Sequence, residues 1–417
     1  MSTENASTSV NRTKPLPLRV LPGIVTRRAT AQRLVLGKLQ RISHGQLSVR
    51  LPDGNRLTFS GDQACDLVAE LVIHNADVFS HLCSGGAMAF AECYIDGLWD
   101  SPDLSALMRL LHRNESALRT HRIGSLLTRL SNRYYHRSRN NNRHGSRRNI
   151  AYHYDLGNDF YRSWLDNGMT YSAALFRQPD MSLEAAQEEK YRTIAKLAGL
   201  RSGSHVLEVG CGWGGFMEYA ARNNNCSVTG ITLSNEQLVW TNERRQRCGS
   251  DSKAELTDYR DTQGNYDAIV SIEMLEAVGE KHWPCFFDSI RARPKPGAAA
   301  VIQVITIDRE RYRHYHRHTD FIQRYVFPGG MLPTNDTLHE QAARAGLVID
   351  YQHNFGKDYA HTLSIWQQRF NAAWPEIQSQ GFDEYFRRLW DYYLSYCETG
   401  FLAGSIDVGI FRLRKPG

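Results

Sequence analysis

Short apolar runs alternate with helical segments throughout the second half of the chain, starting at residue 205. Runs of this length, separated by amphipathic segments, are typical of strands joined by helical crossovers. The pattern therefore predicts an α/β fold with a doubly wound, Rossmann-like sheet of seven strands. The predicted strands cover 205–209, 227–231, 267–272, 298–306, 347–352 and 407–413, with a further one just before Thr257, and helices are predicted from 182, up to about 223, from 235 and over 283–293.

The first third of the chain has a different pattern, which predicts a small α+β domain without visible chemistry. Alternating residues over 45–54 include an Asp-Gly pair and predict a short hairpin. A helix is predicted over 62–86, followed by a second apolar stretch to about residue 113. The expected organisation is a disordered N-terminus (1–30), a small domain (31–125), a basic linker (126–150) and the α/β domain (151–417).

Composition narrows the class of protein. With 417 residues, 41% hydrophobic and 23% charged, the chain is an ordinary globular protein rather than a fibrous or disulfide-stapled one. No apolar stretch reaches the roughly 18 residues that a membrane span needs, and residues 1–14 lack an apolar signal core. The eight cysteines form no C-x-x-C pair, so no metal site is expected. We therefore expect a cytoplasmic protein.

The net charge of +6 is concentrated in one place. Residues 131–150 carry six arginines and no acidic residue. Such a tract can be a solubilising connector, or it can be attracted to an anionic lipid surface. We favour lipid over nucleic acid because no nucleic-acid-binding fold surrounds the tract, and we expect a peripheral location at the inner membrane surface.

The first predicted strand leads into VLEVGCGWGG, which places Gly210, Gly212 and Gly215 in a G-x-G-x-x-G register. Such glycines let the backbone turn tightly and approach a ligand. Residues 228–234 lack the acidic residue that a nicotinamide dinucleotide site would need, so that cofactor is disfavoured. Glu208 instead suits the ammonium group of S-adenosylmethionine, although a glycine turn without a ligand remains the plain alternative. Tyr259 could stack on its adenine ring, with Asp258 accepting from the adenine amine.

Seven ordered motifs resemble the cyclopropane-fatty-acyl-phospholipid synthase family of class I methyltransferases, and the resemblance extends from about residue 41 to 413. They are YHYDLGNDFY, MTYS, VLEVGCGWGG, GITLSNEQ, SIEMLEAVGEKHW, DFIQRYVFPGGMLP and NFGKDYAHTL. The resemblance implies transfer of a methylene unit from S-adenosylmethionine to the cis double bond of a phospholipid acyl chain. The cofactor-binding residues that it implies are Tyr171, Ser172, Glu208, Gly210, Cys211, Gly212, Gly214, Thr232, Leu233, Gln237, Asp258, Tyr259 and Arg260.

Ring closure needs a base, which the resemblance implies is a bound bicarbonate ion. Its predicted ligands are Glu276, Tyr359, the backbone amides of Ile305 and Ala173, and Gln303 where many members have histidine. A glutamine amide donates a hydrogen bond but cannot be cationic, so Gln303 weakens or alters this site. Aromatic faces stabilise a cation without attacking it, and the candidates for this role are Tyr171, Tyr325, Phe327, Tyr359 and Trp366.

Other interpretations stay open at this point. The same cation could lose a different proton and leave a methyl- or methylene-branched chain, a reaction that some relatives carry out beside a flavin-dependent reductase. A small-molecule methyltransferase or a non-catalytic membrane-surface scaffold are further alternatives. The expected partners are an unsaturated phospholipid and an anionic membrane, with no nucleic acid, and the resemblance also allows a homodimer. In a basic insert over 308–333, Arg317 and Arg324 are predicted to contact lipid headgroups.

Overall fold

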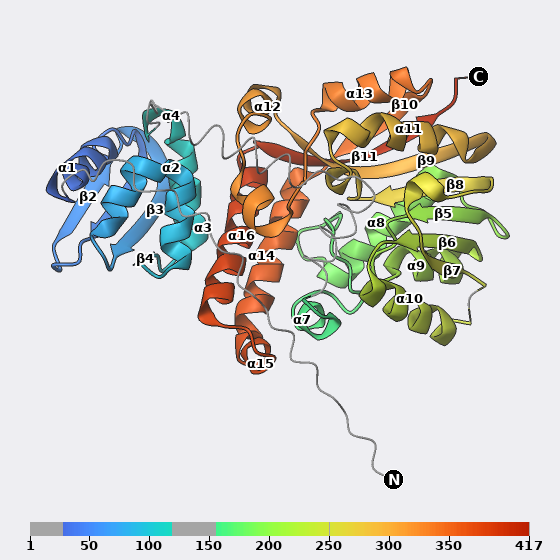
Figure 1. The fold of residues 1–417 in the computed structure, drawn as a ribbon, viewed down its shortest axis with the longest axis horizontal. Coiled ribbons are helices and arrows are strands. Elements are labelled where there is room, and N and C mark those ends of the chain that lie inside the picture. The colour runs from blue at the N-terminus through green and yellow to red at the C-terminus, as the bar shows by residue number, and fades with distance from the viewer. Residues whose placement is uncertain (1–27, 119–155, 250, 417) are drawn as a thin grey trace, which may run out of the picture.

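The computed structural model describes residues 28–118, 156–249 and 251–416, which contain two separate β-sheets (Figure 1). The basic tract at 131–150 and the first residues of the YHYDLGNDFY motif lie outside the described residues. Within the described ranges, no helix combines the length and the apolar character needed to cross a membrane.

A four-stranded sheet with order β2-β1-β3-β4 forms the core of the small N-terminal domain. Strands β1 and β2 pair antiparallel as the predicted hairpin, whereas β1 and β3 pair parallel. The elements of this domain are α1 (Arg28–Leu39), β1 (His44–Arg50), β2 (Arg56–Ser60), β3 (Gln63–Ile73), α2 (Asp77–Ile95), β4 (Trp99–Asp100), α3 (Leu104–Arg113) and α4 (Glu115–Leu118).

Two expectations for this domain were wrong. The helix predicted over 62–86 is strand β3 in its first half, because Ala69 and Leu71 alternate with more exposed neighbours and face the core. Residues 28–30 were expected to be disordered but begin helix α1, where the Arg28 guanidinium pairs with Asp77 and Ala31 is fully buried.

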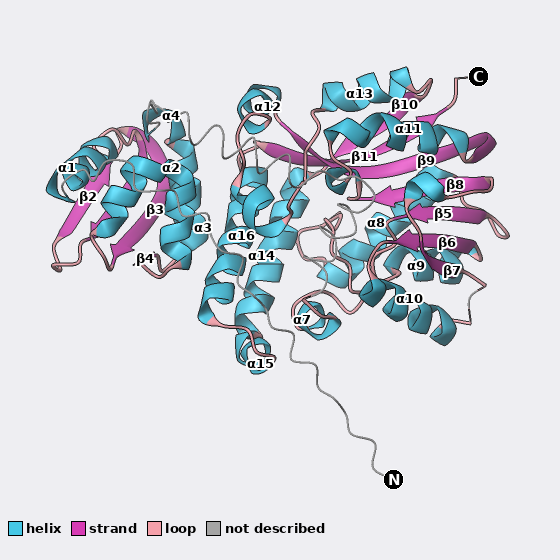
Figure 2. Cartoon of the chain, in the orientation of Figure 1, coloured by secondary structure: helices cyan, strands magenta, loops and turns pink. Residues whose placement is uncertain are grey.

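The second sheet has seven strands in the order β10-β11-β9-β8-β5-β6-β7, which confirms the doubly wound prediction (Figure 2). Strands β5 to β9 are mutually parallel, and β11 is antiparallel to both of its neighbours. The strands are β5 (His205–Val209), β6 (Ser227–Thr232), β7 (Lys253–Leu256), β8 (Tyr266–Ile272), β9 (Pro294–Ile307), β10 (Val348–Asn354) and β11 (Ile406–Arg414). The other elements are α7 (Asn158–Arg162), α8 (Leu183–Ala198), α9 (Gly215–Asn224), α10 (Asn235–Arg247), η1 (Tyr259–Asp261), η2 (Leu275–Ala277), η3 (Glu280–His282), α11 (Trp283–Ala292), α12 (Arg309–Tyr315), η4 (Ile322–Val326), α13 (Asn335–Arg344), α14 (Gly356–Ala372), α15 (Trp374–Ser379) and α16 (Glu384–Leu402).

Both faces of this sheet are covered because its strands are apolar on both sides. Val206 belongs to a cluster formed with helices α8, α9, α14 and α16, whereas its neighbour Leu207 belongs to a second cluster formed with α11 and α13. This near-continuous burial is typical of parallel strands. The carboxyl ends of β5, β6 and β8 therefore meet at one edge, where ligands of such sheets bind.

Helices α14 and α16 stand between the two sheets (Figure 1). The guanidinium of Arg388 on α16 donates to the carbonyl oxygens of Tyr94 and Trp99 and pairs with Asp100. The small domain is thus fastened to the helix pair that also packs on the α/β sheet.

Candidate active site at the carboxyl ends of the parallel strands

The glycine loop after β5 is folded back on strand β6. The backbone N–H groups of Gly210 and Cys211 both donate to the carbonyl oxygen of Ile231, at 3.0 Å each. Gly210 has φ 82°, and a Cβ there would lie 3.0 Å from Cγ of Met274. Only glycine satisfies both conditions, so the loop turns tightly beneath the residues that follow β8.

Glu208 is a buried carboxyl group, and one of its two oxygens has no partner in the described part of the chain. Its side chain is 3% exposed, and Oε2 has no hydrogen bond among the described residues. Burial raises the pKa of Glu208 well above its usual range, although the charges of Arg244 and Lys190 oppose the shift. An unsatisfied buried carboxyl oxygen is costly unless a ligand completes it. The ammonium group of S-adenosylmethionine fits this requirement.

Two further groups of predicted cofactor residues lie beside this loop. Thr232 ends β6, and its hydroxyl donates to Oε1 of Gln237 at 2.8 Å, next to Leu233. Asp258 is already engaged, because the Arg260 guanidinium donates to both of its carboxylate oxygens at 2.7 and 2.6 Å. The Tyr259 ring packs on Phe286 with centroids 5.6 Å apart. The proposed contacts of Asp258 and Tyr259 with adenine stay predictions.

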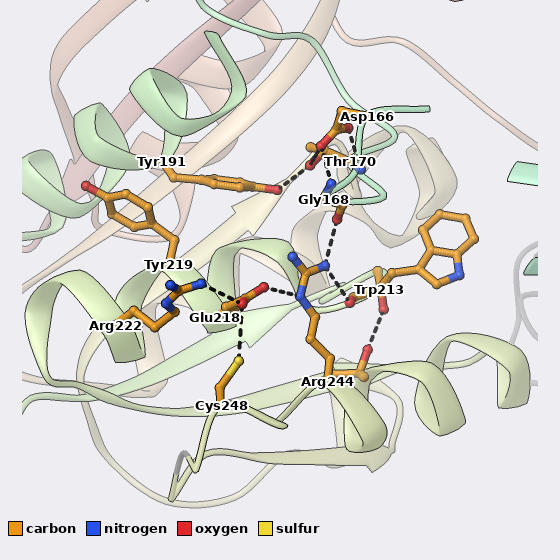
Figure 3. Close-up of polar contacts among 12 residues, drawn as sticks. Asp166, Gly168, Thr170, Tyr191, Trp213, Glu218, Tyr219, Arg222, Arg244 and Cys248 are labelled. Atoms are coloured by element: carbon orange, nitrogen blue, oxygen red, sulfur yellow. Dashed lines mark hydrogen bonds and ion pairs between the residues drawn. The ribbon is translucent and has the colours of Figure 1, made fainter. Parts of the chain in front are cut away.

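Residues 166–172 form a strap over the glycine loop (Figure 3). The buried Asp166 carboxylate accepts from the N–H groups of Gly168 and Thr170, at 2.7 and 2.8 Å. Arg244 Nη1 donates to the carbonyl oxygens of Gly168 and Trp213, at 2.7 and 3.3 Å. Since Trp213 belongs to the glycine loop, one guanidinium ties the strap to the loop.

The strap carries Tyr171 and Ser172, which the sequence predicted as cofactor residues, but Asp166 and Arg244 were missed. The turn signal was present as Asp166-Asn-Gly, a sequence that favours a side-chain-to-backbone turn. Arg244 lies far along α10, so no local pattern connected it with the loop.

Lys190 lies at the centre of the site and is fully buried. Its Nζ donates to the Ser172 hydroxyl at 2.6 Å. Burial lowers the pKa of Lys190 to about 8, against the raising effects of Glu273, Asp166 and Glu208. The sequence signal was its spacing, because Lys190 falls on the apolar face of α8 that also carries Ala186 and Ile194.

The predicted bicarbonate ligands surround a different carboxylate. The Ala173 N–H and Gln303 Nε2 donate to Oε1 of Glu273 at 2.8 and 2.7 Å, and the Tyr359 hydroxyl donates to Oε2 at 2.8 Å. Among the predicted ligands, the Ile305 N–H alone donates to Glu276, at 2.5 Å. The structure therefore brings Ala173, Gln303 and Tyr359 together, but around Glu273, a residue that was not predicted.

The two glutamates differ in their surroundings. Burial, followed by the charge of Glu273, raises the pKa of Glu276 to about 8, and Oε2 of Glu276 has no hydrogen-bond partner in the described chain. Burial also raises the pKa of Glu273, but its amide, hydroxyl and Lys190 neighbours oppose this shift. Two neighbouring carboxyls with unequal stabilisation titrate apart. The three donors favour the anionic form of Glu273, whereas the unpartnered oxygen of Glu276 favours its protonated form.

Aromatic rings line the adjoining region. Tyr171 lies 5.3 Å from Trp366 and 6.5 Å from Phe327, measured between ring centroids, and Tyr359 lies 6.1 Å from Trp366. The Tyr171 hydroxyl also bonds that of Tyr393 at 2.8 Å. The predicted aromatic set thus comes together except for Tyr325, whose hydroxyl donates to Glu92 of the small domain at 2.7 Å.

The two arginines of the basic insert that were expected to contact lipid headgroups differ in exposure. Arg317 is exposed, whereas Arg324 is 18% exposed and lies 3.6 Å from the Glu92 carboxylate. Arg324 therefore contributes to the contact between domains. No group of three or more potential metal ligands occurs within 28–118, 156–249 or 251–416.

Comparison with known proteins agrees with this architecture. Residues 141–411 match the model of the mycolic acid cyclopropane synthetase family. The chain is 34% identical over 402 residues to tuberculostearic acid methyltransferase UfaA1 of Mycobacterium tuberculosis, covering 93% of each protein. It is also 34% identical to cyclopropane-fatty-acyl-phospholipid synthase of Escherichia coli, covering 82% of this chain and 86% of the relative. The solved structure of mycolic acid cyclopropane synthase CmaA1 with SAH and CTAB superimposes with a TM-score of 0.61 at 29% identity, covering 64% of this chain and 98% of that one.

Proposed function

Since the chain belongs to the mycolic acid cyclopropane synthetase family of S-adenosylmethionine-dependent methyltransferases, we propose that it converts the cis double bond of an unsaturated phospholipid acyl chain into a cyclopropane ring. The observation that carries this proposal is the pairing of an anionic carboxylate, Glu273, with the aromatic cluster of Tyr171, Phe327 and Trp366 beside the glycine loop.

The residues meet the demands of this chemistry. The cofactor supplies an electrophilic methyl group, and Glu208 with the glycine loop would hold its amino-acid end. An alkene is a weak nucleophile, so the double bond must be aligned with that methyl group and shielded from water. The faces of Tyr171 and Trp366 stabilise the resulting carbocation by roughly 0.5–2 kcal/mol each without attacking it.

A methyl- or methylene-branched product is the second candidate. It is supported by the similarity to UfaA1, a protein named as a tuberculostearic acid methyltransferase. This similarity extends over 93% of both chains. Branching follows if the cation rearranges by a hydride shift before it loses a proton. A saturated branch would then require a flavin-dependent reductase as a partner.

Product analysis tests the proposal. The purified protein is incubated with vesicles of a cis-monounsaturated phospholipid and S-adenosylmethionine carrying a ¹³C-labelled methyl group. A cyclopropane gives a labelled ring carbon with strongly upfield protons and resists mild hydrogenation, whereas a methylene branch gives labelled vinylic carbon and is reduced. Absence of label from every unsaturated lipid would refute both candidates and favour the scaffold interpretation.

We also propose that the insert contacts an anionic membrane, at the inner surface if the protein is cytoplasmic. Arg313 and Arg317 are exposed on this segment. The test is cosedimentation with vesicles containing phosphatidylglycerol, comparing Arg317→Glu with Arg201→Glu, an exposed control at the amino end of β5. Selective loss of binding in Arg317→Glu supports the contact, and equal binding of both variants refutes it.

A further inference from the structure

Glu273 adopts a backbone conformation that glutamate rarely takes. It is the first residue after β8 and has φ 50°, and it is one of three non-glycine residues with positive φ in the described chain, with Met169 and Asn225. Its N–H donates to the carbonyl oxygen of Gln303 at 2.8 Å, which anchors the turn to β9. Strained conformations of this kind persist where the surrounding structure requires them, and they cluster at functional sites.

The turn delivers a carboxylate into a prepared set of donors. One N–H, one amide NH2 and one hydroxyl, from Ala173, Gln303 and Tyr359, converge on the two oxygens of Glu273 at 2.7–2.8 Å. The donors come from three separate parts of the chain: the strap region, β9 and α14. A set that converges on one anion from such distant segments is specific for a carboxylate-shaped group in that place.

This arrangement does not fit the bicarbonate ion that the sequence implied. The three donors that were expected to grip a free anion are occupied by Glu273, which leaves the Ile305 N–H bonded to Glu276. A free bicarbonate at the same place would overlap the Glu273 carboxylate and repel it electrostatically. The chain therefore carries in covalent form an anion of the same shape.

We propose that Glu273 is the general base of this active site and replaces an exogenous bicarbonate ion. The inference rests on the proposed function. In the reaction, one alkene carbon forms a bond to the methyl carbon of the cofactor as the carbon–sulfur bond breaks, and positive charge forms on the other alkene carbon. Glu273 then takes a proton from the new methyl group. The electron pair of that carbon–hydrogen bond closes the ring, and the neutral carboxyl group returns its proton to solvent after product release.

The neighbours of Glu273 keep it ready to accept a proton. Lys190 is a buried cation close enough to interact with Glu273, and the protonated Glu276 adds no competing negative charge at neutral pH. Burial raises the pKa of the Glu273 carboxyl, which makes it a stronger base than an exposed glutamate.

The first experiment measures bicarbonate binding directly. ¹³C-labelled bicarbonate is titrated with the protein, and its ¹³C line width and chemical shift are followed by NMR. We expect no site-specific binding to the wild type or to Glu273→Gln, in which the side chain still fills the place. We expect binding to Glu273→Gly, because this change vacates the donors and also suits φ 50°. If the wild type and both variants bind bicarbonate with equal affinity, the proposal is overturned.

The second experiment measures turnover in buffer freed of carbon dioxide. Wild-type activity should be unchanged by removing or adding bicarbonate, whereas Glu273→Gln should lose roughly 100-fold or more, the usual contribution of a general base. Bicarbonate should restore roughly tenfold or more to Glu273→Gly but not to Glu273→Gln. Asn225→Gly, at an exposed residue with φ 51°, controls for relief of backbone strain and should behave as the wild type.

The outcomes separate the two proposals. If the wild type forms product only when bicarbonate is added, or if Glu273→Gln keeps full turnover, Glu273 is not the base although the proposed function stands. If no protein forms product from any unsaturated phospholipid, the proposed function fails, and the NMR titration still decides whether Glu273 excludes bicarbonate.

Discussion

Replacing Arg244 by methionine tests whether one guanidinium holds the strap on the glycine loop. Arg244 donates to the carbonyl oxygens of Gly168 and Trp213 and forms an ion pair with Glu218 (Figure 3). The chain offers a matched control, because Arg222 pairs with the same Glu218 at 3.2 Å. The two side chains differ in burial, with 14% of Arg244 and 68% of Arg222 exposed.

The expected effects differ in size for that reason. Removing one partner of a fully buried ion pair costs about 3–5 kcal/mol, which includes the cost of the acceptors that lose their donor. The Arg244–Glu218 pair, with 14% and 20% of its side chains exposed, belongs at the lower end of this range. An exposed pair contributes about 0–1 kcal/mol. Arg244→Met should therefore lower the free energy of unfolding by about 3 kcal/mol more than Arg222→Met, which is a factor of about 100 in the unfolding constant.

Urea unfolding followed by circular dichroism gives the stability difference, and calorimetric titration with S-adenosylmethionine gives the cofactor affinity. Arg244→Met should also weaken cofactor binding, because Tyr171 and Ser172 lie on the released strap. The pH dependence of stability in acid tests the contribution of Glu218 separately. Burial would raise the pKa of Glu218, but the Arg244 charge and hydrogen bonds from Cys248, Arg244 and Arg222 lower it overall. This stabilisation is present above the ordinary glutamate pKa and is lost as the pH falls, so the variant should lose less stability in acid. Equal stability and equal cofactor affinity in the two variants would refute the reasoning.

Three further predictions concern other parts of the molecule. The folded state raises the pKa of Glu276 to about 8, so the contribution of Glu276 to stability falls as the pH rises from the ordinary glutamate pKa to about 8. Glu276→Gln should flatten the pH dependence of the unfolding free energy over this pH range. An unchanged slope would contradict the assignment. Gly214→Ala should weaken cofactor binding and stability by about 2 kcal/mol or more, since Gly214 has φ 79° and a Cβ would lie 2.8 Å from Thr241 Cγ2. In the control Gly249→Ala, the residue has φ 61° and a Cβ would meet no atom within 4 Å, so only the conformational cost of about 1–2 kcal/mol is expected. Arg388→Met should give two separate thermal transitions by calorimetry. Arg387→Met should not, because it removes a partly exposed pair with Glu384 and a contact with the Trp374 ring, neither of which involves the small domain.

Much of the α/β half could be predicted because its strands are short apolar runs bounded by helices. The predicted bounds of β5 agree with the structure at both ends, and Ser182 caps α8 as expected by accepting from the Ala185 N–H. Strand β3 failed because Leu67 and Leu71 satisfy helical spacing as well as alternation. Its parallel partner β1 lies about twenty residues earlier, and that pairing decided the outcome.

The site was predictable only where its residues follow one another. The glycine loop and Glu208 lie in one motif. Glu273, by contrast, is held by hydrogen bonds from Ala173 and Tyr359, which are 100 and 86 residues away in sequence. Its carboxylate stood in the motif SIEMLEAVG three positions before Glu276. Nothing local indicated that a positive φ would aim the earlier glutamate, rather than the later one, at these donors.

The docking of α16 on the small domain limits how the molecule can be divided. The Arg388 guanidinium covers the Tyr94 ring at 4.2 Å, and Tyr94 meets Tyr392 at 5.7 Å between centroids. Cutting away residues 28–118 would expose this aromatic face and leave Arg388 without its acceptors. The α/β half produced alone should therefore self-associate through α16. The design of a minimal enzyme would first have to replace the newly exposed aromatic residues of that helix by polar ones.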